Sequence, residues 1–128
     1  MVREVVLTRE SLDTVRLAMR APGDAVNGAV VVFHGVVRGS EAGKPIGGIE
    51  YTAFERMAVH QFGLLLDAIE SRWGVSSIRL HHRLGRVPAG EVSLWVEVVA
   101  PHRGEAFAAC QWLIDEMKRV VPIWKQIW

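Results

Sequence analysis

The chain has 128 residues, 50% of them hydrophobic, which is enough for one well-filled core. Its 15 basic and 14 acidic side chains leave a formal net charge of +1, which excludes a general attraction to nucleic acid or to anionic membranes. Cys110 is the only cysteine, which excludes an internal disulfide and a cysteine-based metal cluster. We therefore expect residues 1–128 to form a single domain, in which any anion chemistry is local.

The N-terminus and the cysteine content also bear on the compartment. Arg3 and Glu4 stand where a secretory signal peptide needs an apolar run. No later stretch has the length and hydropathy of a membrane span. A single cysteine fits a reducing environment, so we predict a cytoplasmic protein.

In the first part of the chain, the pattern predicts a strand over residues 4–8 and a short helix over 11–19. We expect Ser11 to cap this helix and residues 21–24 to end it. The run of β-branched residues over 28–37 then predicts a largely buried strand.

That strand would deliver Arg38 to its C-terminal end. The glycine, serine and proline content of residues 39–48 predicts a mobile loop. Alternating residues over 49–53 predict a further strand.

Residues 55–73 predict a long helix, because apolar residues recur at steps of three and four. Its expected buried face consists of Met57, Val59, Phe62, Leu65, Leu66 and Ile69. Residues 76–84 and 91–100 predict two strands joined by a turn over 85–90, where proline and glycine are concentrated.

The last helix is predicted from about residue 104 to residue 120, where Pro122 stops it. Gln111, Asp115 and Lys118 share one of its faces. Another face is the expected buried stripe, made of Phe107, Cys110, Leu113, Ile114, Met117 and Val121.

The order of these elements predicts the fold class. Helices and strands do not alternate regularly, so an α+β domain is favoured over a doubly wound parallel sheet. Trp112, Trp124 and Trp128 crowd the end of the chain, where they suit either an interface or core packing.

Two neighbouring side chains suggest an anion site. His102 and Arg103 follow a strand and begin a helix, where backbone N–H groups and the helix dipole favour a phosphate. The alternative is that Arg103 is an ordinary exposed residue at a helix start and binds no ligand.

Three further cations are candidates. Lys118 lies on the last helical turn, where a solvated lysine is also common for stability alone. Lys125 is flanked by Ile123 and Trp124, whose apolar surface could immobilise its ammonium group. Arg38 follows a buried strand, where it is either delivered to a pocket or is an ordinary arginine at the edge of the sheet.

Other candidate sites are excluded by their patterns. His81 and His82 are adjacent in a strand, so they point to opposite faces and do not share a metal. Cys110 lies on an apolar stripe and is expected to stay a buried thiol. No glycine-rich phosphate loop and no serine nucleophile elbow is present.

Taken together, the chain resembles the large subunit of molybdopterin synthase over nearly its whole length. The segments that carry the resemblance are Gly28-Ala29-Val30-Val31-Val32-Phe33-His34-Gly35-Val36-Val37-Arg38, Ile49-Glu50-Tyr51, His82-Arg83-Leu84-Gly85 with Gly90-Glu91, Ala100-Pro101-His102-Arg103 with Ala106-Phe107, Asp115-Glu116-Met117-Lys118, and Pro122-Ile123-Trp124-Lys125.

The resemblance implies a fold of the α/β-hammerhead type, with mostly antiparallel strands and a long C-terminal helix. It implies a homodimer at the centre of a heterotetramer, in which each end binds a small ubiquitin-like sulphur-carrier subunit. The implied enzyme is a sulphurtransferase of molybdenum cofactor biosynthesis. It moves two sulphurs from the small subunit's C-terminal thiocarboxylate to cyclic pyranopterin monophosphate, forms the molybdopterin dithiolene, and uses neither metal nor organic cofactor.

The resemblance also assigns roles to the five candidate cations. Arg38, His102 and Arg103 would bind the phosphate and the pterin. Lys118 would be catalytic, stabilising developing charge or transferring a proton, and Lys125 would support it; both would also contact substrate. A lysine can transfer protons only where burial or neighbouring cations lower its pKa.

Two positions depart from the family pattern. Val36 stands where relatives often carry a basic residue, and the sequence stops at Trp128, where the family continues with a tail that helps cover the pocket. We therefore expect weakened substrate binding.

Two other functions remain as alternatives. The main one is a shortened, non-catalytic paralogue that only binds the small subunit or a pterin. The other is a generic anion or nucleic-acid binder, but this sequence lacks the basic stripe with interleaved aromatic residues that such a surface needs.

Overall fold

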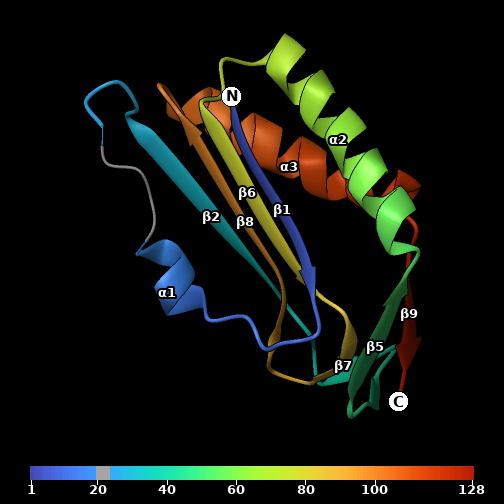
Figure 1. Ribbon diagram of the computed structural model, residues 1–128. Coiled ribbons are helices and arrows are strands. Elements are labelled where there is room, and N and C mark those ends of the chain that lie inside the picture. The colour runs from blue at the N-terminus through green and yellow to red at the C-terminus, as the bar shows by residue number, and fades with distance from the viewer. Residues whose placement is uncertain (20–23) are drawn as a thin grey trace.

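The computed structural model describes residues 1–19 and 24–128, and most of the expected helix stop over 21–24 lies outside them. Mixed helices and mostly antiparallel strands confirm the α+β prediction (Figure 1). In chain order the elements are β1 (Val2–Thr8), α1 (Thr14–Ala18), β2 (Ala29–Val36), β3 (Ser40–Glu41), β4 (Lys44–Pro45), β5 (Gly48–Ala53), α2 (Glu55–Arg72), β6 (Ser77–Arg83), β7 (Gly85–Pro88), β8 (Val92–Ala100), α3 (Arg103–Val120) and β9 (Ile123–Ile127).

The larger sheet has the strand order β1-β6-β8-β2. β1 runs parallel to β6, whereas β6–β8 and β8–β2 are antiparallel. Helices α2 and α3 lie on one face of this sheet and α1 lies on the other (Figure 1). β2 is therefore an edge strand whose outer hydrogen-bonding groups are unpaired among the described strands.

The main core lies between the larger sheet and helices α2 and α3. Its fully buried members include Phe62 and Ile69 of α2, Leu80 of β6 and Leu113 of α3. This burial supplies the main stabilisation of the helices on the sheet, because removing apolar surface from water is the dominant favourable term in folding.

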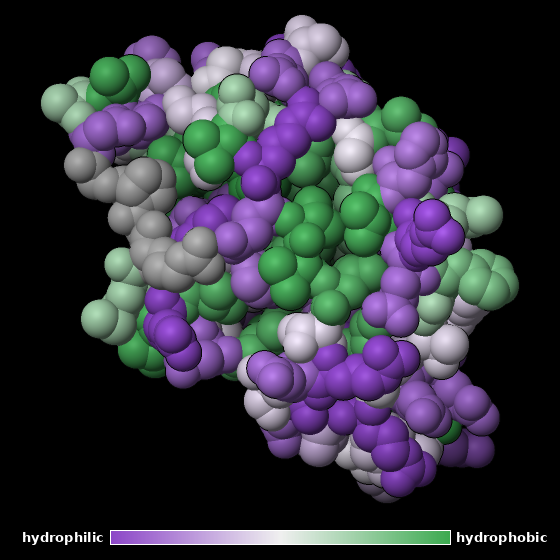
Figure 2. Space-filling view, viewed as in Figure 1, coloured by the Kyte–Doolittle hydropathy of each residue, from purple (hydrophilic) through white to green (hydrophobic). Residues whose placement is uncertain are grey.

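Buried charge lies on the opposite face of the sheet, under α1. Arg79 binds both carboxylate oxygens of Glu97, at 2.8 and 2.9 Å, and also donates to the Leu17 carbonyl of α1. The Arg79 guanidinium also lies 4.8 Å from the Trp95 ring centroid. Figure 2 shows this side of the molecule, where green apolar side chains lie among purple hydrophilic ones.

A smaller sheet, with the order β7-β5-β9, extends from the strand ends of the larger one (Figure 1). The pattern did not predict β7, which was expected to be part of a turn, or β9, because no element was predicted after Pro122. β9 is mostly exposed and forms because all five of its residues pair with β5. Such long-range pairing leaves no local hydrophobic signal.

The expected mobile loop over 39–48 is instead largely ordered. β3 and β4 pair there as a short hairpin. Its turn has Ala42 at φ 50° and Gly43 at φ 78°, a left-handed conformation that glycine adopts without steric cost.

The expected burial of three residues and the expected cap of α1 were also wrong. Met57, Val59 and Phe107 were expected to be buried but are 55%, 48% and 61% exposed. The buried faces pass instead through small residues such as Ala58, Ala106 and Ala109, which a pattern of large apolar residues does not mark. The N-cap of α1 is Asp13, not Ser11, and its carboxylate accepts from the Arg16 N–H.

The predicted burial of β2 is correct on one face only. Val30, Val32 and Val36 are 47%, 42% and 51% exposed, because the other face of this edge strand is the one that packs on the core. None of the described helices is both long and apolar enough to cross a membrane.

Candidate active site

Arg38 lies two residues beyond the end of β2. Its side chain is 81% exposed, and its guanidinium is 3.7 Å from the Glu41 carboxylate. The preceding residue, Val37, is buried in a small cluster with Ile49 and Val87. The backbone before Arg38 is therefore anchored while its charged group stays available to a ligand.

Lys125 lies in β9, directly opposite Tyr51 of β5. Tyr51 packs against the same cluster that holds Val37. The strand that carries Lys125 and the segment that carries Arg38 are therefore held by one set of buried side chains. The structure gives the exposed Lys125 side chain no partner among the described residues.

Lys118 lies on the last turn of α3, as predicted, and its side chain is exposed. No hydrogen bond or ion pair occupies it among the described residues. The next residue, Arg119, is bound to Glu116 at 2.7 Å. Lys118 is thus the cation on this turn that remains free to meet an anion.

His102 and Arg103 lie at the N-terminus of the same helix. His102 is the N-cap residue, and its side chain makes no capping hydrogen bond. Both side chains are exposed. Backbone N–H groups of a first turn without a side-chain cap, together with two basic side chains, can bind an anion.

These five residues do not form one cluster within the chain. His102 and Lys118 lie at opposite ends of α3, about 24 Å apart at a rise of 1.5 Å per residue. The register of β2 and β8 also separates Arg38 from His102. The start of β2, at Ala29, pairs with Ala100 close to His102, whereas the end of β2, at Val36 close to Arg38, pairs with Val92. The structure therefore places Arg38, Lys118 and Lys125 toward one end of the molecule, and His102 and Arg103 at the other.

A groove of about 340 Å³ runs between β2 and α3, between these two ends. Most of its lining is apolar, and Gln111 and Asp115 are the polar exceptions; the lining residues are Val31, Val32, Phe33, Phe107, Cys110, Gln111, Ile114 and Asp115. Burial raises the pKa of the Cys110 thiol to about 11, so this cysteine is neutral and not a nucleophile near neutral pH.

Gln111 and Asp115 share a helix face with Lys118, as the spacing predicts, but neither was predicted to be a site residue. Their spacing of four and three residues was the available signal. What was missing was the opposing wall, because Phe33 and Val31 of β2 lie far from α3 in sequence.

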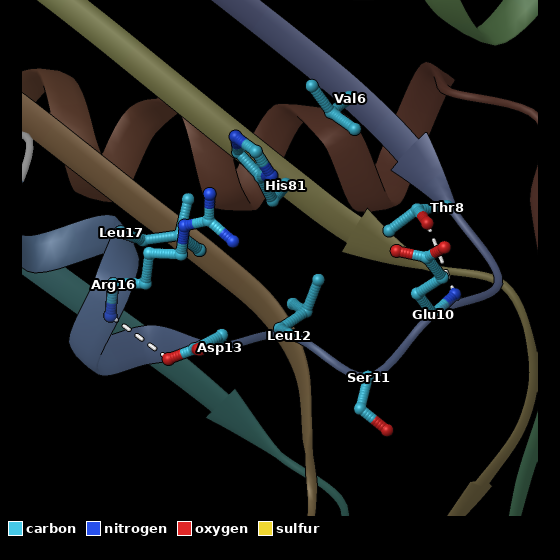
Figure 3. Close-up of a pocket in the computed structure, with 9 residues that line it drawn as sticks. All are labelled: Val6, Thr8, Glu10, Ser11, Leu12, Asp13, Arg16, Leu17 and His81. Carbon is cyan, nitrogen blue, oxygen red and sulfur yellow. Dashed lines mark hydrogen bonds between the residues drawn. The ribbon is translucent and has the colours of Figure 1, made fainter.

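A second cavity, of about 480 Å³, lies on the α1 side of the sheet. It is lined by residues of β1, β6 and the segment 10–17, including Arg16 and His81 (Figure 3). The His81 Nε2 is 2.8 Å from the Glu4 carboxylate. None of the five predicted site residues lines this cavity.

The described residues contain no group of three or more His, Cys, Asp or Glu side chains able to hold a metal ion. The five predicted site residues are all basic and are divided between two ends of the molecule. Such an arrangement can bind anions and stabilise negative charge as it develops.

Comparison with known proteins gives a family. The profile of the family described as MoaE protein matches residues 7–120. The molybdopterin synthase catalytic subunit of Nostoc sp. strain PCC 7120 is 46% identical over 104 residues, which cover 80% of this chain and 63% of the relative. That of Culex quinquefasciatus is 39% identical over 77% of this chain and 64% of the relative. The chain thus spans somewhat less than two thirds of the length of these relatives.

Solved structures agree with this family in fold. The crystal structure of molybdopterin synthase from Staphylococcus aureus superposes with a TM-score of 0.85 and 31% identity, covering 98% of this chain and 89% of that one. A protein–protein complex of subunits 1 and 2 of molybdopterin-converting factor from Helicobacter pylori gives a TM-score of 0.76 and 25% identity, over 99% of this chain and 84% of that one. Because the family profile spans most of the sequence and the fold agrees throughout, the chain belongs to the MoaE protein family.

Proposed function

We propose that this protein transfers sulphur from the C-terminal thiocarboxylate of a small ubiquitin-like subunit to cyclic pyranopterin monophosphate, forming the molybdopterin dithiolene. The observation that carries the proposal is the free Lys118 side chain, which lies on the same side of the molecule as Lys125 and Arg38. The relatives named molybdopterin synthase catalytic subunit support it.

The chemistry requires fixed positive charge at such a site. The donor tail is anionic, the acceptor carries a phosphate, and opening a cyclic phosphate develops further negative charge. We assign Lys118 to the reacting groups, where it stabilises this charge or transfers a proton, with Lys125 as its support. Arg38, His102 and Arg103 bind the phosphate and the pterin.

A homodimer would unite the two groups of cations. If two copies pair through their β2 edges, two-fold symmetry makes the paired strands antiparallel. The start of one β2, beside His102 and Arg103, then faces the end of the other, beside Arg38. The exposed stripe of Val30, Val32 and Val36 on β2 supports such an interface.

The second partner in this proposal is the small subunit, and the Helicobacter pylori complex of two subunits supports it. An extended tail that ends in a thiocarboxylate would have to reach Lys118 and Lys125. We propose one small subunit at each end of the dimer, giving a heterotetramer. The reaction needs neither a metal nor an organic cofactor, and we assign it to the cytoplasm.

The decisive experiment incubates the protein with thiocarboxylated small subunit and precursor and measures molybdopterin. We expect product in proportion to the thiocarboxylate supplied, and none with an unmodified small subunit. If the protein binds the thiocarboxylated subunit but makes no product at any precursor concentration, the enzyme assignment is wrong, and a module that only binds the subunit becomes the better account.

A further inference from the structure

The strand that carries Lys125, β9, lies at the edge of the smaller sheet and is held by β5 alone (Figure 1). None of its residues 123–127 is fully buried, and four of the five are exposed. Burial of one face normally fixes the register of a strand, and a slip of one residue turns every side chain to the other face of the sheet. A different kind of contact must therefore keep Lys125 opposite Tyr51.

Trp128, directly after β9, makes such a contact with the start of β5. Its backbone N–H donates to the Gly48 carbonyl at 3.1 Å, and its carbonyl accepts from the Gly47 N–H at 2.6 Å. Its indole ring lies against both glycines: a Cβ added to Gly47 would be 2.7 Å from the indole Nε1, and one added to Gly48 would be 2.5 Å from Cη2. Only glycine at these two positions leaves room for the ring.

Arg86 of β7 makes a further contact with the same ring. Its guanidinium lies 4.4 Å from the ring centroid of Trp128, within the range of a cation–π interaction. Because β7 and β9 both pair with β5, the indole joins all three strands of the smaller sheet. We call Trp128, the two glycines 47 and 48, and Arg86 the tryptophan clamp.

The start of β9 has a separate anchor at Trp124. The rings of Trp124 and Phe54 meet edge-on with their centroids 4.7 Å apart, and the Phe54 N–H donates to the Pro122 carbonyl at 3.2 Å. Trp124 precedes Lys125 by one residue, whereas the clamp follows it by three. Without the clamp, the strand would stay attached at its start while the part from Lys125 onward could shift or fray against β5.

We propose that Trp128 is a positioning residue for Lys125, because the tryptophan clamp keeps β9 in the register in which Lys125 lies opposite Tyr51. This inference rests on the proposed function for the role of Lys125 in sulphur transfer. Trp128 acts on turnover through the lysine and does not touch substrate. A misplacement of about 1 Å can lower a rate by about a hundredfold, so the clamp matters to the reaction although the main core does not need it.

The register is measured without an activity assay, by NMR on the whole protein. We expect the wild type to show a cross-strand Hα–Hα contact between Lys125 and Tyr51 and slowly exchanging amides in β9. Trp128→Ala should lose this contact and exchange its β9 amides at least about tenfold faster, while circular dichroism shows an otherwise intact fold. An unchanged contact and unchanged exchange in Trp128→Ala overturn the proposal.

Gly47→Ala is a second, smaller perturbation, because the three atoms nearest to its added Cβ all belong to the Trp128 indole. It should shift the ring and reproduce the NMR changes of Trp128→Ala. Gly63→Ala is the matched control, since a Cβ there meets nothing within 4 Å, and it should leave β9 unchanged. A Gly47→Ala variant with wild-type β9 spectra would also contradict the clamp.

Single-turnover sulphur-transfer assays test the link to Lys125. Trp128→Ala should lower the rate at least about tenfold, but by less than about twofold when Lys125 is already alanine, because two changes that act through one group are not additive. Additive losses, or normal turnover by a Trp128→Ala variant whose register has changed, overturn the positioning role. A wild type that makes no molybdopterin, while Trp128→Ala still loses the contact between Lys125 and Tyr51, refutes the proposed function and leaves the register assignment standing.

Discussion

His102 precedes the first residue of α3, and Lys118 lies on the last turn of the same helix. The length of the helix keeps the two residues about 24 Å apart within one chain. A single phosphate-bearing substrate cannot contact both in one protomer. The proposed reaction therefore predicts that each site takes its cations from two copies of the chain.

Complementation between inactive variants tests this composite site. We expect Lys118→Ala and Arg103→Ala each to be inactive alone, and their co-expressed mixture to recover about a quarter of wild-type activity. Random assortment makes half of the dimers mixed, and each mixed dimer has one complete site if the cations come from different chains. Sites built within one chain would give no recovery, and light scattering that finds only monomers at micromolar concentration would also contradict the prediction.

The Lys118→Ala variant should lose sulphur transfer while keeping its fold. Removing one group that stabilises transition-state charge lowers kcat by about a hundredfold or more. The side chain is exposed and alanine favours helix, so the melting temperature should stay within about 3 °C of wild type. Arg119→Ala, one residue further on, is the control and should keep kcat near normal. Normal turnover in a folded Lys118→Ala protein would remove this lysine from the mechanism.

The buried pair of Arg79 and Glu97 predicts a large effect on stability. Their side chains are 6% and 0% exposed, so Glu97→Ala leaves an uncompensated buried guanidinium and should lower the free energy of unfolding by about 3–5 kcal/mol. Urea denaturation measures this loss. Replacing both residues with apolar ones of similar size, Arg79→Met with Glu97→Leu, should recover much of it. A double variant no more stable than Glu97→Ala would argue against this explanation.

Cys110 predicts a dependence of stability on alkaline pH. Burial raises the pKa of its thiol from 9.0 to about 11, so between these values the unfolded chain releases a proton that the folded chain retains. The contribution of Cys110 to the free energy of unfolding is therefore complete below pH 9 and declines as the pH rises toward 11. The difference in unfolding free energy between wild type and Cys110→Ser should shrink over this range. A difference that is constant with pH would contradict the burial of the thiol.

Local pattern predicted much of the fold. Periodic apolar residues gave α2 and α3 to within two residues at each end, because a helix that packs on a core repeats its buried face along the sequence. The same approach failed for β9 and β7, whose pairing with β5 brings together residues distant in sequence. It also misplaced Phe107, because burial of Ala106 and Ala109 depends on how α3 is rotated against the sheet.

For the candidate site, the sequence is sufficient to identify five basic residues beside the predicted ends of strands or helices, namely Arg38, His102, Arg103, Lys118 and Lys125. These properties depend on residue type and on nearby neighbours. The division of these five residues between two ends of the molecule, with the groove that contains Asp115 between them, follows from the folded structure alone. The reason is geometric: a rigid helix fixes the separation of its ends, and the wall that β2 adds to the groove arises only when the chain has folded.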